Sequence, residues 1–174
     1  MIKSVYIPDY LFHSVLDVSP EDLISRGIKL VAVDADNTIV YDNTIDFIDG
    51  AKDWVEKIKE SGLEIAVVSN ASPNRAKKIS EHLGIKTYGL SFKPHPKGIL
   101  RAAKDFNLKP SEIAMIGDQI TTDIVAANRA GAVSIKTDKV ENEIRFYYYY
   151  ALRRKREASL MAQILKTKGY GFND

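Results

Sequence analysis

The sequence predicts an α/β fold with a mostly parallel central sheet and helices on both of its faces. Short apolar runs alternate with longer stretches of helical pattern along the middle of the chain, an order typical of βαβ units. Gly62, Gly84 and Gly131 follow three of the helical stretches and are expected to end them. With 174 residues, of which 45% are hydrophobic and 28% charged, the chain suits one globular domain.

The first predicted strand covers residues 28–33, a run of β-branched and small apolar side chains. A helix is expected over 47–61, where Gly62 stops it. The second strand, 64–69, has the apolar sequence Ile-Ala-Val-Val at its centre. Ser72 and Pro73 have the pattern of an N-cap followed by proline at the first helical position, so a helix is expected over 73–83.

The second half of the predicted sheet repeats this alternation. Short apolar runs predict the strands, and the longer stretches between them predict the helices. We expect strands at 86–90, 113–116 and 132–136, and helices at 97–106 and 122–130.

The predicted core spans about residues 26–137 of a single domain over 1–174, with extensions at both ends. The N-terminal extension carries Tyr6, Ile7, Tyr10, Leu11 and Phe12, and the C-terminal one carries a tyrosine run and a basic cluster. Two interpretations stay open for each: packing on the sheet, or contact with an anionic membrane surface. The C-terminal residues concerned are Tyr147 to Tyr150, Arg153, Arg154, Lys155, Arg156, Lys166 and Lys168.

Composition excludes several kinds of chemistry. The chain has no cysteine, so disulfides, thiolate catalysis and cysteine-bound metals are ruled out. A net charge of +2 and the lack of a recognition motif give no reason to expect nucleic acid. No apolar run approaches the roughly 18 residues of a membrane span, and no signal peptide is evident. We expect a cytoplasmic protein whose membrane contact, if any, is peripheral at the inner surface; the oligomeric state is left open.

Polar side chains follow each of the first four predicted strands. Because ligands of parallel α/β sheets bind beyond the carboxyl ends of the strands, these side chains are expected to meet at one edge of the sheet. They are Asp34, Asp36 and Thr38 after the first strand, Ser69 and Asn70 after the second, Lys93 after the third, and Asp118 and Asp123 after the fourth.

Asp34 and Asp36 pose an electrostatic problem that a cation would solve. Two carboxylates about 4 Å apart repel by roughly 4 kcal/mol at an effective dielectric constant of about 20. A proton shared on one of them is one solution, and a bound cation is another. With Asp118 arriving at the same edge, the sequence predicts a hard divalent ion held by oxygen atoms, and Mg²⁺ suits a site that also takes a substrate phosphate.

These residue types predict a phosphatase. Mg²⁺ and Lys93 would offset the repulsion between a phosphate and a carboxylate nucleophile, and Ser69 would hold phosphate oxygens. Asp34 is the expected nucleophile, forming an aspartyl-phosphate. Asp36 is the expected general acid and base. Thr38 is a candidate phosphate contact that is also expected to fix its loop by hydrogen bonding, while Asn70 is open between phosphate contact and loop scaffolding.

The motifs resemble those of the haloacid dehalogenase superfamily of phosphatases. They are Asp34-x-Asp36-x-Thr38, Val-Val-Ser69-Asn70, Lys93-Pro94, and Gly117-Asp118 with Asp123 five residues beyond Asp118. The resemblance implies a Rossmann-like fold, the residue roles given above and a metal held by Asp34, Asp118 and the backbone carbonyl of Asp36. Asp123 stays open between a direct metal ligand, a residue that supports the ligands from behind and a helix cap, and Lys97 is an alternative to Lys93.

A narrower resemblance is to the class IIIA, YqeG-type branch, which includes phosphatidylglycerophosphate phosphatases. Segments such as Lys-Pro-His-Pro-Lys and Gly-Asp-Gln-Ile-Thr-Thr-Asp carry it, although Ala35 stands where a larger aliphatic residue is more usual. The stretches from Thr38 to Ser69 and from Ser69 to Lys93 are too short for a cap domain. An open site suits a phosphate carried on a lipid or another large molecule.

Two other interpretations remain. One is a phosphatase for a soluble sugar, a nucleotide or a polynucleotide end. The other is a phospho-accepting or binding module without turnover, since receiver domains also place aspartate, a hydroxyl and lysine at strand ends.

Overall fold

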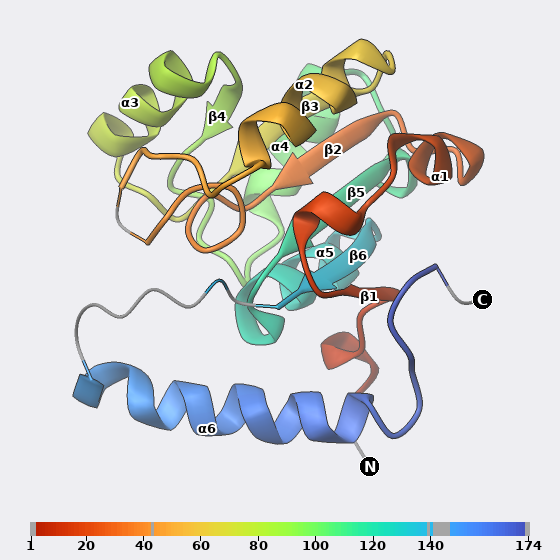
Figure 1. Ribbon diagram of the computed structural model, residues 1–174, viewed down its shortest axis with the longest axis vertical. Coiled ribbons are helices and arrows are strands. Elements are labelled where there is room, and N and C mark those ends of the chain that lie inside the picture. Colours follow the sequence, from red (N-terminus) through yellow and green to blue (C-terminus); the bar gives the residue numbers. More distant parts are fainter. Residues whose placement is uncertain (1–2, 43, 139, 141–146, 173–174) are drawn as a thin grey trace.

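The computed structural model describes residues 3–42, 44–138, 140 and 147–172, and only the backbone from 147 to 154. Its six-stranded sheet has the order β1-β6-β5-β2-β3-β4, and all neighbouring strands are parallel. The predicted α/β class is confirmed (Figure 1). The strands are β1 (Tyr10–Phe12), β2 (Leu30–Val33), β3 (Glu64–Val68), β4 (Lys86–Tyr88), β5 (Ile113–Gly117) and β6 (Val133–Thr137).

Helices cover both faces of the sheet, so its central strands are buried on both sides. In β2, Val31 and Val33 pack with α1, α2 and α3, whereas Leu30 and Ala32 pack with α4 and α5. Successive side chains of a strand point to opposite faces, which is why this strand is apolar throughout. The helices are α1 (Pro20–Ser25), α2 (Ala51–Glu60), α3 (Pro73–Leu83), α4 (Lys97–Asp105), α5 (Val125–Ala130) and α6 (Tyr147–Ile164).

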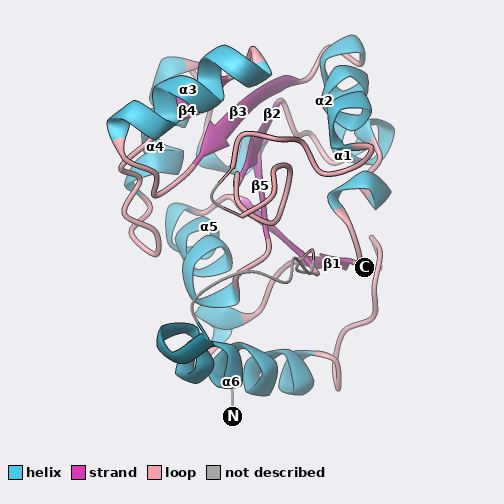
Figure 2. Cartoon of the chain, turned by 60° about the vertical axis from the view of Figure 1, so that its left-hand side comes forward, coloured by secondary structure: helices cyan, strands magenta, loops and turns pink. Residues whose placement is uncertain are grey.

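The two chain ends meet at the β1 side of the sheet. Leu11, Ile120 and Ile164 form a small buried cluster there, so α6 docks beside β1 and the turn after β5. The Tyr10 and Phe172 rings pack edge to face with their centroids 4.8 Å apart. Figures 1 and 2 show α6 at one end of the molecule and α2 and α3 at the other.

The structure answers part of the question left open for the two extensions. Leu11 and Phe12 are buried, so this part of the N-terminal segment packs in the core. The side chains of Tyr147 to Tyr150, Arg153 and Arg154 lie outside the described residues. Within the described part of the chain, every helix is too short or too polar to cross a membrane.

Several elements differ from the prediction in extent. The helix expected at 47–61 begins only at Ala51, because Gly50 has a left-handed φ of 81° and the Ile48 amide bonds the Ile39 carbonyl. The helix expected at 122–130 is a π-helical turn, Ile120–Ile124, followed by α5. Neither β1 nor α1 was predicted, and β1 extends the sheet beyond the expected core.

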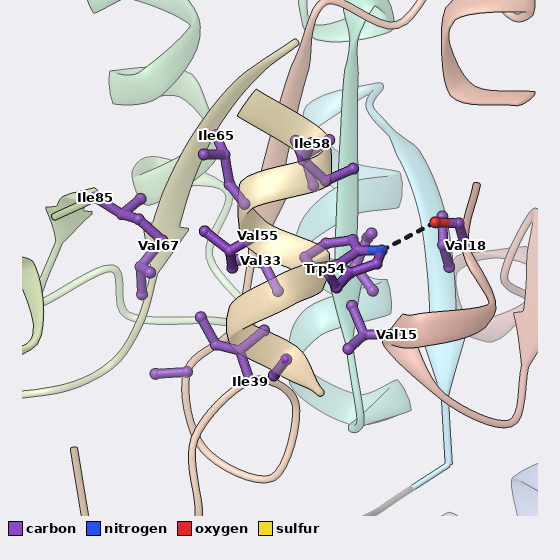
Figure 3. Close-up of a cluster of buried hydrophobic side chains, with 14 of the residues drawn as sticks. Val15, Val18, Val33, Ile39, Trp54, Val55, Ile58, Ile65, Val67 and Ile85 are labelled. Carbon is purple, nitrogen blue, oxygen red and sulfur yellow. Dashed lines mark hydrogen bonds between the residues drawn. The ribbon is translucent and has the colours of Figure 1, made fainter. Parts of the chain in front are cut away.

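Trp54 of α2 links this helix to the segment before α1. Its ring is buried among apolar side chains on the face of the sheet that α1, α2 and α3 cover. Its indole N–H donates a 2.9 Å hydrogen bond to the carbonyl of Val18 (Figure 3). The bond satisfies a buried donor and a carbonyl that the loop would otherwise leave unpaired.

We expect Trp54→Phe to lower the free energy of unfolding by about 1–3 kcal/mol, because a buried carbonyl loses its donor and the smaller ring leaves space. Urea unfolding followed by circular dichroism measures the change. Lys52→Ala on the exposed side of the same helix is the control, with an expected change within about 0.5 kcal/mol. Equal unfolding midpoints for Trp54→Phe and the wild type would contradict this account.

Candidate active site

The carboxyl ends of the strands bring the predicted residues to one edge of the sheet. Asp34 follows β2, Ser69 follows β3 and Asp118 follows β5, while Lys93 lies in the loop after β4. All four side chains are buried. The strand order places β2 between β3 and β5, so Asp34 occupies the middle of this edge.

Lys93 is the centre of an ion-pair cluster. Its Nζ lies 2.6 Å from Asp34 Oδ1 and 2.7 Å from Asp123 Oδ1, and all three side chains are at least nine-tenths buried. The contact with Asp34 has hydrogen-bond geometry, whereas the one with Asp123 is an ion pair without that alignment. Lys97 is exposed, so of the two alternatives the structure places Lys93 in the cluster.

Burial and charge act against each other in this cluster. Burial raises the pKa of Asp34 to about 7, although Lys93 favours the ionised form. Burial also raises the pKa of Asp118 well above its ordinary value, and Asp123 and Asp34 add to the effect. Desolvation disfavours the Lys93 ammonium, but Asp123 and Asp34 outweigh it and raise its pKa. Three buried carboxyl groups thus crowd around one ammonium, and without a further cation Asp34 and Asp118 are driven to hold their protons.

Asp123 sits in a position that only glycine at 117 allows. A Cβ at Gly117 would lie 2.5 Å from Asp123 Cγ, closer than real Cβ contacts come. Asp123 Oδ2 also accepts a 3.0 Å hydrogen bond from the Gln119 amide. Both oxygens of Asp123 thus have contacts within the protein. This arrangement is compatible with either role of Asp123, positioning Lys93 or binding a metal.

Asp36 points away from this cluster, toward α3. Its carboxylate forms two bonds with the Arg75 guanidinium, of 2.6 and 2.7 Å, and Arg75 also donates to the Thr44 carbonyl at 2.9 Å. The carboxylate raises the pKa of Arg75 through these hydrogen bonds. Both side chains are about one-fifth to one-quarter exposed, so the pair lies at the mouth of the site.

Of the remaining predicted residues, Asn70 and Ser69 brace the loops, whereas the expected hydrogen bond from the Thr38 side chain to its loop is not seen among the described residues. Asn70 bonds the Lys93 backbone twice: it accepts from the amide at 2.7 Å and donates to the carbonyl at 3.0 Å. Ser69 Oγ accepts from the Ala71 amide at 3.1 Å. Thr38 is buried, and its hydroxyl has no hydrogen-bond partner among the described residues. Of the two roles left open for Asn70, the structure shows the scaffolding one.

The carboxylates fit a hard divalent cation. Asp34, Asp118 and Asp123 each offer one oxygen atom within 4.8 Å of the other two, and all three are buried. Asp118 Oδ1 has no hydrogen-bond partner among the described residues, which leaves a buried carboxyl oxygen unsatisfied. Oxygen ligands and surplus negative charge are what Mg²⁺ binds. The Asp36 carboxylate is outside this group.

Two buried or anchoring residues escaped the prediction. Lys136, at the end of β6, is buried and donates to the Thr137 carbonyl; burial lowers its pKa, and Asp118 is the main opposing influence. Glu157 of α6 accepts from the amides of Ile120 at 2.9 Å and Thr121 at 2.8 Å. Glu157 thereby ties the C-terminal helix to the turn that carries Asp123.

The site and fold define a class of hydrolase, and comparison with known proteins agrees. The haloacid dehalogenase-like hydrolase family matches residues 15–131. The chain belongs to this family, and within it to the phosphatases, enzymes that hydrolyse phosphoric monoesters.

Curated relatives place it more closely. "Probable phosphatase YqeG" of Bacillus subtilis is 32% identical and matches 98% of this chain and 97% of its own length. Phosphatidylglycerophosphate phosphatase 1 of Arabidopsis thaliana is 27% identical over 84% of this chain and 44% of its own. A glyceraldehyde 3-phosphate phosphatase of Pyrococcus furiosus is 30% identical over 58% of this chain and 48% of its own.

Solved structures are similar to this chain in fold, and at these low identities the likeness concerns the fold only. An uncharacterized protein from Listeria monocytogenes superposes with a TM-score of 0.55 at 20% identity, over 68% of this chain and 86% of that one. A hypothetical protein from Xanthomonas campestris superposes with a TM-score of 0.53 at 16% identity, over 86% of this chain and 94% of that one.

The raised pKa of Asp34 makes stability depend on pH. Between about pH 4 and pH 7 the unfolded chain has released a proton that the folded, metal-free protein keeps on Asp34. The free energy of unfolding should therefore fall as the pH rises through this window. We expect Asp34→Asn to make the fall shallower, measured by urea unfolding in EDTA at several pH values. Asp49→Asn, at an exposed carboxylate, is the control, and an unchanged slope in Asp34→Asn would contradict the assignment.

Proposed function

We propose that this phosphatase is Mg²⁺-dependent, works through a phosphorylated Asp34, and acts on a phosphomonoester carried by a lipid, phosphatidylglycerophosphate or a related one. The observation that supports the chemistry is the buried cluster of Asp34, Asp118 and Asp123 around Lys93, with Asp34 at the centre of the sheet edge. Such a cluster combines a nucleophile, a fixed cation and carboxylates able to bind another.

In the first step an oxygen of Asp34 forms a bond to phosphorus, and the bond from phosphorus to the leaving oxygen breaks. Lys93 holds Asp34 Oδ1 and is placed to offset charge on the transferring group. Mg²⁺, held by Asp34, Asp118 and the Asp36 backbone carbonyl, would supply further positive charge beside the phosphate. Asp36 gives its proton to the leaving oxygen.

In the second step Asp36 removes a proton from water as the water oxygen bonds to phosphorus. The bond between phosphorus and Asp34 breaks, phosphate leaves, and Asp36 is again protonated for the next cycle. The ion pair with Arg75 holds the Asp36 carboxylate outside the cluster. We expect this pair to open when substrate binds, because the anionic substrate is a competing partner for the guanidinium. Ser69 and Thr38 are the expected hydroxyl contacts for phosphate oxygens.

The short connections between the site motifs support a large substrate, because they hold no cap domain. From Thr38 to Ser69 the chain forms α2, β3 and their connections, and from Ser69 to Lys93 it forms α3, β4 and theirs. Among the described residues, neither stretch contains a further helix or strand that could form a cap. The full-length likeness to the B. subtilis phosphatase and the partial likeness to the plant phosphatidylglycerophosphate phosphatase support a lipid.

A soluble phosphate ester is the second candidate. The likeness to the P. furiosus glyceraldehyde 3-phosphate phosphatase favours it, although that match covers only 58% of this chain. The alternative of a phospho-accepting module without turnover is set aside, because the family and the named relatives are phosphatases.

The covalent mechanism predicts different losses for the two motif aspartates. Asp34→Asn should abolish turnover, since no nucleophile remains. Asp36→Asn should slow both steps by about 10²- to 10⁴-fold and let phospho-enzyme accumulate. Phosphate release and acid-quenched ³²P incorporation measure the two effects, with Asp42→Asn, an exposed carboxylate after the same strand, as the control. Substantial turnover by Asp34→Asn would rule out the nucleophile assigned here.

The substrate proposal is tested by a panel of phosphomonoesters with Mg²⁺. Phosphatidylglycerophosphate in vesicles should give a kcat/KM at least about tenfold above glyceraldehyde 3-phosphate, phosphoglycolate, nucleotides and a phosphorylated oligonucleotide, because an uncapped site gains little from a small leaving group. Higher kcat/KM for a soluble ester would show that the lipid assignment is wrong and leave the chemistry intact.

A further inference from the structure

The loop that carries Lys93 holds large apolar side chains out to solvent. Leu90 is 41% exposed and Phe92 is 56% exposed. Leu100 of the following helix is 43% exposed, so three of the six exposed large hydrophobic residues among the described residues fall within this short stretch. Single exposed apolar residues are ordinary, but such a concentration beside a catalytic centre marks an interaction surface.

The backbone of the loop is strained where these side chains project. Leu90 has a φ of 47° and Phe92 a φ of 53°, both in the left-handed region that residues other than glycine, asparagine and aspartate seldom adopt. Strain of this kind persists only where the surrounding structure imposes it, and it concentrates at functional sites. An apolar side chain at each position has no role in the core that would explain the strain.

Alternating backbone contacts impose this conformation. The amides of Leu90 and Ser91 donate to the carbonyls of Ala71 and Ser69 at 3.0 and 3.1 Å, and the Lys93 amide donates to Asn70. Ser91 is fully buried against Gly98, where a Cβ would lie 2.3 Å from the Ser91 hydroxyl. The loop is therefore fixed, and Leu90 and Phe92 are presented to solvent by a rigid support.

Basic side chains surround the apolar ones. Lys97, Arg101 and Lys104 are exposed between residues 89 and 104, a stretch without Asp or Glu that Asp105 follows. Lys97 Nζ lies 5.4 Å from the centre of the Phe92 ring, and an Arg101 nitrogen donates to the Gly89 carbonyl at 3.3 Å. From the α5 side, Arg129 donates to the Pro94 carbonyl at 3.0 Å.

One exposed face of α4 continues this pattern. Lys97, Leu100, Arg101 and Lys104 are all exposed, and their spacing of three and four residues places them on one side of the helix. We call Leu90, Phe92, Lys97, Leu100 and Arg101 the rim surface. The rim surface combines exposed apolar side chains with positive charge. In the chain it comes directly after β4, which is an edge strand of the sheet in the described part of the chain (Figure 1).

We infer that the rim surface docks on an anionic phospholipid bilayer, with Leu90 and Phe92 entering the interface and Lys97 and Arg101 meeting the headgroups. Apolar side chains that reach below the headgroups, flanked by Lys and Arg, are the pattern that binds such interfaces. Nucleic acid would use the cations but leave the aliphatic Leu90 without a partner. The inference rests on the proposed lipid substrate, which docking would bring to the open site beside Lys93.

Sedimentation with vesicles tests the docking without using catalysis. The wild-type chain should bind vesicles of phosphatidylglycerol and phosphatidylcholine, neither of which is a phosphomonoester, at least about tenfold more tightly than pure phosphatidylcholine. Leu90→Asn/Phe92→Asn should weaken binding about tenfold or more, and asparagine tolerates the left-handed backbone, so the fold should persist. Lys97→Glu/Arg101→Glu changes the same surface through exposed positions alone and should weaken binding similarly.

Ile24→Ser is the matched control. Ile24 is 46% exposed and lies beside Gly62 and Glu64, at the amino end of β3, whereas Leu90 and Phe92 follow the carboxyl end of β4. Vesicle binding by Ile24→Ser should therefore equal that of the wild type. No binding by the wild type, unchanged binding by both rim variants, or preference for an oligonucleotide over the vesicles would overturn the docking. Vesicle binding together with a preference for soluble esters would overturn the lipid substrate and leave the docking standing.

Discussion

The contact of one buried ammonium with two buried carboxylates is the constraint on which the site depends. Lys93 lies 2.6 Å from Asp34 and 2.7 Å from Asp123, while Asp118 stands close by with an oxygen that has no partner among the described residues. Buried carboxylates in excess of their cations are costly unless another positive group binds. The same crowding of carboxyl groups is the basis for the proposal that a divalent cation, and with it a phosphate, binds here.

The fold maintains this arrangement by fixing the backbone around each charged group. Asn70 bonds both the amide and the carbonyl of Lys93, and Gly117 leaves the space that Asp123 occupies. At the mouth of the site, by contrast, Arg75 and Asp36 form a partly exposed pair whose exchange of partners needs only side-chain movement. A fixed centre with an adjustable ion pair at its mouth suits a substrate that arrives on a larger surface.

The sequence predicted the centre of the site better than its surroundings. The rule that polar residues after parallel strands share one edge located Asp34, Ser69, Lys93 and Asp118. Lys136 escaped it because this residue lies within the last strand rather than after it. The Arg75–Asp36 pair and the Glu157 anchor depend on how α3 and α6 lie against the sheet, which local pattern does not specify. Helix starts were wrong where a single left-handed residue, Gly50, or a π-helical turn decided them.

Calorimetric titration of the metal-free protein with Mg²⁺ tests the central claim most directly. The excess of carboxylates over Lys93 predicts one Mg²⁺ bound per chain, with affinity at least about tenfold lower in Asp118→Asn, which keeps the shape of the side chain and removes its charge. Equal affinity in the two proteins, or no binding by the wild type, would contradict the claim that this cluster is completed by a divalent cation.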